Sequence, residues 1–321
     1  MDENGSSLSA VNGNENWKFT VCQDAFCILA LVVAYITEAL ILVLNSVCLV
    51  VLRRVRGVQE TTKLFMMSLT LSDLCNGIFY GIPNIRYYMF YPSVDGPFCK
   101  IMPFLSLALF TINVLSLVML TIDRFLAITY TLHYPRLMTL KRSKVMILLV
   151  WSLTIMLYSA WCCILYVGTQ TDQNEFFELV ILCLWLYPSL VYLIVVILGV
   201  SLGTILILYA YILKVARCQA RLIASQNILG NIEGRQNVPG PISTKSATTV
   251  IIITGTACLC WMPSVIVLSI QIIKGQMLPK NVYVIIIFLF SCSSWLNCII
   301  YYWRNREFKQ ALHNFKPLCC H

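Results

Sequence analysis

The sequence has few charged residues and lacks the side-chain combinations that are typical of enzymes. Only 12% of its 321 residues are charged, whereas 59% are hydrophobic, and this balance is too apolar for a soluble domain of such length. The histidines His133, His313 and His321 do not pair with Cys, Asp or Glu at catalytic or metal-binding spacing. The sequence contains no phosphate-binding glycine loop either. We therefore expect no enzyme, and we expect lipid to be the solvent of the fold.

Two further features are missing from the chain. It contains no internal repeat and no pair of matching half-length apolar segments, which many secondary transporters have. A channel or transporter is therefore the weakest hypothesis for its function. No apolar run precedes residue 25, so we expect no cleavable signal peptide and a first span that directs its own insertion.

Seven apolar runs are each long enough to cross a bilayer as a helix. They cover residues 25–52, 62–90, 98–129, 145–167, 179–216, 245–272 and 281–303. The sequence thus predicts an all-α membrane protein, a seven-transmembrane helix bundle over residues 25–303. Residues 1–24 form an expected extracellular tail, 217–244 a cytoplasmic loop and 304–321 a short cytoplasmic tail. Gly, Pro and Asn between Ala224 and Ser243 favour a flexible conformation in this loop.

Basic residues indicate the orientation of the seven spans. With the amino terminus outside, the outer segments contain only Lys18, Arg86, Lys100, Lys274 and Lys280, and the rest of the 23 Lys and Arg lie in cytoplasmic segments. The net charge of +9 therefore reflects membrane topology rather than nucleic-acid binding. Basic residues beside the spans would also attract the anionic inner leaflet, so membrane lipids are expected partners. We expect a multi-pass protein of the plasma membrane with an extracellular amino terminus.

Two of the 15 cysteines are placed to meet at the outer face of the bundle. Cys99 lies at the outer end of the third span and Cys183 at the outer start of the fifth. A disulfide between them would hold the second outer loop in an oxidising compartment. Other outer cysteines could compete for either partner, namely Cys22, Cys27, Cys162 and Cys163. Asn4, in the triplet Asn4-Gly5-Ser6 of the expected outer tail, is an acceptor for N-glycosylation.

Polar side chains on three spans fall at one depth in the membrane. Asp73, Asn113 and Ser293 each lie about 10 or 11 residues outward of the basic residue at the inner end of their span, a distance of about 16 Å. A carboxylate in hydrocarbon needs partners, so we expect Asp73 to contact polar groups or an ion. The candidates are Asn113, Ser293, Ser294, Asn297, water or a cation. A dry hydrogen-bond network and a protonated carboxyl group are the alternatives to a bound ion.

The segment after the last span is typical of a short amphipathic eighth helix on the inner leaflet. Residues Arg304 to Leu312 combine basic side chains with Phe308 and Leu312, which are spaced by four. Cys319 and Cys320 follow in a basic context beside the membrane, which suits reversible palmitoylation. Two unmodified cysteines are the alternative.

Short motifs recur along the chain at defined spans and depths. They are Asn45, Leu71-Ser72-Asp73, Cys99, Asp123-Arg124-Phe125, Trp151, Tyr209, Cys260-Trp261-Met262-Pro263 and Asn297-Cys298-Ile299-Ile300-Tyr301. Through these motifs the whole chain resembles a rhodopsin-like (class A) G-protein-coupled receptor, without indicating a subfamily. The resemblance implies a transducer that converts binding of an extracellular ligand into activation of a heterotrimeric G protein. It also implies an allosteric sodium ion at Asp73 and no other cofactor.

The resemblance assigns switch roles to residues at the inner ends of the spans. Asp123 would hold Arg124 in the inactive state, and Tyr209 and Tyr301 are placed to approach Arg124 when span six moves outward. The alternative is an arginine that only extends to lipid phosphate. The acidic partner that the family has near the inner end of span six is missing, because residues 243–245 are Ser, Thr and Lys.

Other positions also depart from the pattern of the family. Its proline in span five is Ser201 here, its aromatic residue in span six is Ala257, and its proline in span seven is Cys298. Pro263 is retained and kinks span six above Trp261, so a ligand that presses on Trp261 could move this hinge. Constitutive, biased or absent signalling are therefore all open, and a receptor-like protein that binds partners without G-protein signalling is the second hypothesis.

The resemblance also restricts the ligand. Ser106 stands where amine receptors carry an Asp, and Ser291 stands where opsins carry the retinal lysine, so we expect neither a typical biogenic amine nor retinal. The expected ligand-binding residues form a mainly apolar pocket with a few hydroxyls. They are Ser106, Leu107, Phe110, Trp261, Ser264, Val265, Leu268 and Ile287. A small apolar or lipid-like molecule and a short peptide are both allowed. Arg86 could receive an anionic group and Glu38 a donor, unless they are paired interface residues.

Arrestin is a further partner that the resemblance allows. Residues 304–321 contain no Ser or Thr, so recruitment would depend on hydroxyls near the inner ends of spans five and six. These are Ser225, Ser243, Thr244 and Ser246.

Overall fold

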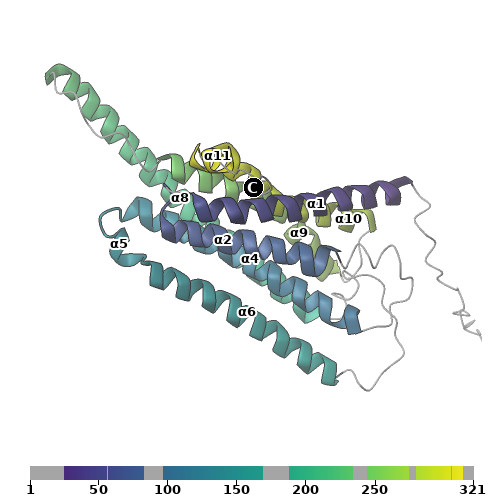
Figure 1. The fold of residues 1–321 in the computed structure, drawn as a ribbon. Coiled ribbons are helices and arrows are strands. Elements are labelled where there is room, and N and C mark those ends of the chain that lie inside the picture. The colour runs from purple at the N-terminus through teal and green to yellow at the C-terminus, as the bar shows by residue number, and fades with distance from the viewer. Residues whose placement is uncertain are drawn as a thin grey trace, which may run out of the picture.

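The protein is a bundle of helices that lie side by side (Figure 1). The computed structural model describes residues 25–55, 57–82, 97–168, 188–233, 244–274, 280–304 and 306–313. In chain order the elements are α1 (Ala25–Arg54), α2 (Glu60–Asn76), η1 (Gly77–Gly81), α4 (Pro97–Thr129), α5 (Tyr134–Leu137), α6 (Leu140–Gly168), α8 (Pro188–Glu233), α9 (Thr244–Lys274), α10 (Lys280–Arg304) and α11 (Arg306–His313). Within these ranges all regular secondary structure is helical. The predicted all-α fold is confirmed.

Six helices in the described part of the chain are long and apolar enough to cross a membrane, namely α1, α4, α6, α8, α9 and α10. The remaining span is α2, which η1 continues as a single π-helical turn. It is less apolar than the others because many of its buried side chains are polar, among them Thr62, Ser68 and Asp73. These groups avoid lipid by facing the other helices, where they find partners.

α4 is the central helix of the bundle. In the most apolar stretch of α4, 72% of the residues are buried, compared with 11% in the corresponding stretch of α6. α4 packs against α2, α6, α8 and α9, whereas α1 packs against α2 and α10. α6 lies along one edge of the bundle in the view of Figure 1. Side chains on α4 can therefore meet groups from several helices, and the polar sites described below depend on this helix.

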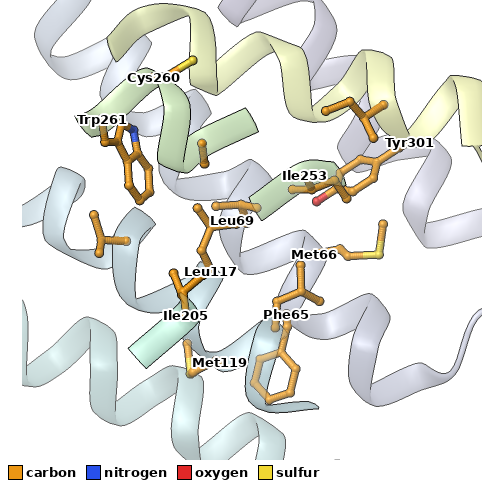
Figure 2. Packing of buried hydrophobic residues seen from close by; sticks show 14 of the residues in the cluster. Phe65, Met66, Leu69, Leu117, Met119, Ile205, Ile253, Cys260, Trp261 and Tyr301 are labelled. Atoms are coloured by element: carbon orange, nitrogen blue, oxygen red, sulfur yellow. The ribbon is translucent and has the colours of Figure 1, made fainter. Parts of the chain in front are cut away.

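The apolar core holds these helices together at their contacts. Figure 2 shows Phe65 and Leu69 of α2 near Leu117 of α4, with Ile205 of α8 and Ile253 of α9 close by. All five side chains are fully buried. Because lipid tails are as apolar as these residues, close packing rather than release of water stabilises such contacts in a membrane.

The inner end of α8 corrects one expectation from the sequence. The helix is 46 residues long and continues to Glu233, so the stretch from Ala224 to Glu233 is helical rather than flexible. The residues after Arg217 include several Ala, Leu, Gln and Arg, which are strong helix formers and outweigh the single Gly230. Figure 1 shows this part of α8 projecting beyond the bundle.

The eighth helix is present as α11 and is anchored to the bundle. Its Phe308 is 3% exposed and packs on the ring of Tyr301 at a centroid distance of 6.3 Å. Between α1 and α2 the chain turns through Gly57, which has a φ of +121°. A Cβ atom at Gly57 would overlap the carboxylate of Glu307. The first inner turn and α11 are thus in direct contact.

Candidate functional site

A buried carboxylate occupies the expected polar layer. Asp73 is 1% exposed and accepts a hydrogen bond from Asn113 Nδ2 at 2.6 Å through Oδ1. Its Oδ2 accepts a hydrogen bond from Asn297 Nδ2 at 3.3 Å, and the side chain of Ser294, also buried, lies near this carboxyl group. Side chains of α2, α4 and α10 therefore meet at Asp73. Their donors offset the desolvation of the carboxylate.

The chemistry of this layer suits a small hard cation. Carboxylate, hydroxyl and amide oxygens are the ligands that such ions prefer, and Asp73, Asn113, Ser294 and Asn297 can all offer one. The described residues contain no cluster of three or more His, Cys, Asp or Glu, so a multi-carboxylate site for a divalent metal is not found among them. The amide groups that now point N–H toward Asp73 could turn their oxygens to an ion.

Ser293 has a different role from the one expected. Its hydroxyl donates to the Phe290 carbonyl at 2.7 Å and accepts a hydrogen bond from Trp261 Nε1 at 3.1 Å. Ser293 therefore links the polar layer of α10 to the tryptophan of α9 instead of bonding to Asp73.

Trp261 is part of an aromatic cluster. Its ring meets Phe110 edge to face at 5.9 Å and stacks on Phe290 at 6.4 Å, while Phe110 and Phe290 are 4.4 Å apart. The cluster joins α4, α9 and α10 one layer outward of Asp73. Phe290 was not among the residues expected from the sequence, although its position three residues before Ser293 places it on the same face of α10.

The expected ligand-binding residues lie on the side of Asp73 that is opposite to the Asp123–Arg124 end of the bundle. Leu107, Phe110, Trp261 and Ser264 are buried, and the others are partly exposed. Those partly exposed residues are Ser106, Val265, Leu268 and Ile287. Ser264 Oγ and Gln271 Oε1, two turns apart on α9, are buried and have no hydrogen-bond partner among the described residues. Gln271 was not expected from the sequence. Its spacing of seven residues from Ser264 places both side chains on the same face of α9, and this pattern could have identified it.

At the end of the bundle that faces α5, Asp123 and Arg124 form a buried ion pair. Arg124 donates to Asp123 Oδ2 from Nε at 3.0 Å and from Nη2 at 2.6 Å. Asp123 is fully buried and Arg124 is 6% exposed. A guanidinium that only extended to lipid phosphate would not be enclosed in this way.

Two neighbouring segments complete the surroundings of this ion pair. Thr62 of α2 donates to Asp123 Oδ2 at 2.7 Å, and the hydroxyl of Tyr134 in α5 donates to Asp123 Oδ1 at 2.6 Å. Arg124 Nη2 also donates to Gln59 Oε1 at 2.8 Å and to the Thr62 hydroxyl. Burial, followed by the hydrogen bond to Asp123, raises the pKa of Tyr134 above its ordinary value. These partners could not be assigned from the sequence, because the fold alone brings α2 and α5 to Asp123.

The two expected switch tyrosines lie in the core. Tyr209 of α8 donates a hydrogen bond to Thr254 of α9 at 2.6 Å. The hydroxyl of Tyr301 is buried and has no hydrogen-bond partner among the described residues. Tyr301 is thus available to form a new hydrogen bond if the helices rearrange.

Other motif residues also face the interior. Trp151 Nε1 of α6 donates to Ser68 Oγ at 3.0 Å. The substituted positions Ser201, Ala257 and Cys298 are all buried, so each acts through packing or hydrogen bonds inside the bundle.

Several expected sites lie outside the described part of the chain. Cys183, Cys319, Cys320, Asn4 and Arg86 are outside the described residues, and the side chain of Cys99 is not described either. Cys162 and Cys163, two of the competing cysteines, are free thiols in the structure.

Comparison with known proteins agrees with this arrangement. A family model described as "7 transmembrane receptor (rhodopsin family)" matches residues 44–301. The histamine H2 receptor of Cavia porcellus is 28% identical over 312 residues, which cover 94% of this chain and 81% of that receptor. The tachykinin-like peptides receptor 86C of Drosophila melanogaster is 22% identical over 294 residues, 86% of this chain and 56% of that receptor. The alpha-1A adrenergic receptor of Mus musculus is 24% identical over 304 residues, 83% of this chain and 62% of that receptor. With most of its length matched, the chain belongs to the rhodopsin family of seven-transmembrane receptors.

Proposed function

We propose that this receptor couples an extracellular ligand in the outer half of the bundle to a heterotrimeric G protein at its inner face. The observation that carries the proposal is the enclosed Asp123–Arg124 ion pair, with Nη2 of Arg124 2.6 Å from Oδ2 of Asp123. A buried charge pair at a membrane interface is expensive to maintain and is typical of a functional site. Its release would present a guanidinium to a partner protein.

The route from ligand to inner face runs through contacts within the bundle. A ligand that displaces Trp261 would disturb its stacking on Phe290 and its hydrogen bond to Ser293. Pro263 lies inside α9 and removes one helical hydrogen bond there, so it serves as the hinge for an outward swing of the inner half. That swing would separate Thr254 from Tyr209 and free Tyr209 to move toward Arg124.

The ligand class follows from the lining of the outer half. The lining is mainly apolar, with the buried hydroxyl of Ser264 as a polar group, and position 106 carries a serine rather than a carboxylate. The names of the relatives do not narrow the ligand class, because they refer to amines and to tachykinin-like peptides alike. We propose a small apolar or lipid-like molecule or a short peptide, rather than a typical biogenic amine or retinal.

The remaining features form part of the same proposal. The receptor would lie in the plasma membrane with its amino terminus outside, glycosylated at Asn4 and crosslinked between Cys99 and Cys183. Palmitoylation at Cys319 and Cys320 would hold the tail at the inner leaflet behind α11. Arrestin would be recruited, if at all, through hydroxyls of the third inner loop.

The experiment that tests the proposal needs no ligand. Basal activation of each G-protein class is measured in transfected cells for the wild type, Arg124→Ala and Arg53→Ala at matched surface expression. Arg53 is exposed at the inner end of α1, so its replacement controls for the loss of one inner positive charge. Basal activity that is lost only in Arg124→Ala supports the receptor function and names the G protein.

A non-signalling binding protein is the second candidate. It is favoured by the changed positions Ser201, Ala257 and Cys298, which are all buried in the transmission region. Equal signals from the wild type and Arg124→Ala in every G-protein class would contradict coupling through Arg124 and favour this second candidate.

A further inference from the structure

Glu38 is an acidic side chain on the inward face of α1. It shares this face with Ile41, Asn45 and Cys48, which follow at helical spacing and are all buried. The Oε1 atom of Glu38 is also buried, and it has no hydrogen-bond partner among the described residues. A carboxylate without a partner inside a bilayer is costly, and intramembrane acids that face the bundle interior usually serve a function.

The wall opposite Glu38 is formed by two glycines of the π-helical turn. A Cβ atom at Gly77 would lie 2.8 Å from Glu38 Oε1, and one at Gly81 would overlap the carboxyl group. Any larger residue would therefore displace the acid. π-Helical turns are rare and are frequently found at functional sites. The absence of side chains at both positions thus lets the Glu38 carboxyl group pack directly against the backbone of η1.

The carboxyl group of Glu38 lies at the depth of the proposed ligand site. Glu38 is seven residues outward of Asn45, which bonds to Ser294 in the polar layer at 3.3 Å. Ser106 is likewise seven residues outward of Asn113, which bonds to Asp73. Two helical turns correspond to about 10 Å in each case. Glu38 and Ser106 therefore lie at the same level above the polar layer.

Two ion pairs in the described part of the structure are remote from this acid. Lys63 pairs with Glu60 and Arg124 pairs with Asp123, and both pairs lie at the inner face. One helical position before Gly77, the Asn76 Oδ1 is a second buried acceptor that has no partner within the described ranges. This level of the bundle thus offers two buried acceptor atoms, and a donor with a positive charge forms the strongest hydrogen bond to a carboxylate.

From this geometry we infer that Glu38 binds the ammonium group of a ligand, at the wall formed by α1, α2 and η1. The apolar body of the ligand would extend toward α4 and α9. This inference deepens the proposed function, because it gives the ligand a basic group that is held by a different helix from the one that carries Ser106. It rests on the proposed function only for its physiological meaning, since binding can be measured without a G protein.

The test uses the purified full chain in lipid nanodiscs and follows its thermal unfolding. The ammonium probes are methylamine, 2-phenylethylamine and octylamine, which differ in apolar bulk. The matched probes 2-phenylethanol and 3-phenylpropanoate have a similar body with a neutral or an acidic end. The variants are Glu38→Gln, Glu38→Asp and Gly81→Ala. Glu60→Gln is the control, because Glu60 is an exposed glutamate at the inner end of α2.

We expect at least one amine to raise the unfolding temperature of the wild type and of Glu60→Gln by about 3 °C or more. In Glu38→Gln the half-maximal amine concentration should rise by about tenfold or more, since a buried charge pair is lost. Glu38→Asp should show a smaller increase. Gly81→Ala, which crowds the carboxyl group, should also weaken the response.

Three results would overturn the inference. They are equal stabilisation of Glu38→Gln and wild type by the amines, no stabilisation of the wild type by any of the three amines, and the same Glu38 dependence for 2-phenylethanol as for 2-phenylethylamine. A failure of this kind leaves the Arg124 test of receptor function unaffected. Conversely, Glu38-dependent binding without any G-protein response would support this site and contradict the proposed function.

Discussion

The thiol of Cys298 donates a hydrogen bond to Asn45 Oδ1 at 3.2 Å and thereby fastens α10 to α1. Asn45 is itself bound to α10, because its Nδ2 donates to the Ser294 carbonyl at 3.3 Å. The motif of the family has a proline at position 298. Proline has neither a backbone N–H group nor a side-chain donor, so it could not form this hydrogen bond. α10 instead runs from Lys280 to Arg304 as one helix, and a cysteine hydrogen bond joins it to its neighbour.

Replacing Cys298 should show the strength of this connection. Cys298→Ala removes the donor and leaves the buried Asn45 Oδ1 without it, which should destabilise the protein by roughly 1 kcal/mol. Cys298→Ser keeps a donor and should retain most of the stability. Thermal unfolding in nanodiscs measures both, with Cys163→Ala, at an exposed free thiol, as the control. Equal losses in the Ala and Ser variants would show that packing, not the hydrogen bond, is important at this position.

Tyr134→Phe should raise basal signalling. The hydroxyl of Tyr134 is 2.6 Å from Asp123 Oδ1 and 2.7 Å from Thr61 Oγ1, so its loss frees α5 and removes one donor from the acid that holds Arg124. A hydrogen bond to a charged group contributes about 1.5–3 kcal/mol, and partial loss in the inactive state would shift basal activity by roughly threefold to tenfold. The G-protein assay of the Arg124 experiment measures this effect. Unchanged basal activity at equal surface expression would argue against a restraining role for α5.

The same tyrosine should give the protein a distinct response to alkaline pH. Burial and the bond to Asp123 raise its pKa above the ordinary value of 10.0, so the folded state holds the proton more tightly than the unfolded state. The contribution to stability is present below pH 10 and is lost as pH rises through the raised pKa. Unfolding measured above pH 10 should therefore show a steeper fall in stability for the wild type than for Tyr134→Phe. Parallel curves would contradict this contribution.

Gly57→Ala should destabilise the inner turn. The φ of +121° at Gly57 is unfavourable for any residue with a Cβ, and the new methyl group would also overlap Glu307. Strain of this kind costs about 1–3 kcal/mol. Gly203→Ala in α8 is a matched control, because a Cβ there meets nothing within 4 Å and alanine favours a helix by roughly 0.5–1 kcal/mol.

A double variant separates the two causes. Gly57→Ala combined with Glu307→Ala removes the overlap but keeps the backbone strain, so only part of the stability should return. Full recovery in the double variant would show that φ contributes little.

Sodium should stabilise the wild type through Asp73. The carboxylate and its neighbouring oxygens suit a hard cation, and Asp73→Asn removes the negative charge that would attract it. Thermal unfolding is compared in sodium chloride and choline chloride of equal ionic strength, with Glu60→Gln as the control for loss of an exposed carboxylate. We expect a sodium-specific rise in the wild type and in the control, but not in Asp73→Asn. If the two salts act alike on the wild type, the polar layer is a hydrogen-bond network without an ion.

The depth of a residue in the membrane could be predicted from the sequence. A helix rises by a fixed distance per residue, so counting from the inner basic residues brings Asp73 and Asn113 to one level, and the structure joins these two by a hydrogen bond. Helix lengths follow from bilayer thickness in the same way. Residue depth and helix length could both be predicted because each is a distance along the membrane normal.

The rotation and lateral contacts of each helix were harder to predict. Ser293 has the expected depth, but its rotation directs it to Trp261 instead of Asp73. Gln59 and Thr62 reach Arg124 only because α2 packs on α4. The helical stretch after Arg217 was missed for another reason, since turn-forming residues around it received more weight than its own helix propensity.

The length of α8 has a consequence for whatever approaches the inner face. The 17 residues from Arg217 to Glu233 extend the membrane helix by about 25 Å as a rigid rod. The direction in which its far end faces is therefore set by the rotation of α8 within the membrane. Inserting a single residue in this stretch would turn that end by about 100° and lengthen the rod by about 1.5 Å. A flexible loop would absorb the same insertion. In α8, by contrast, the number of residues in the helix sets the direction in which its far end faces relative to the membrane-spanning part.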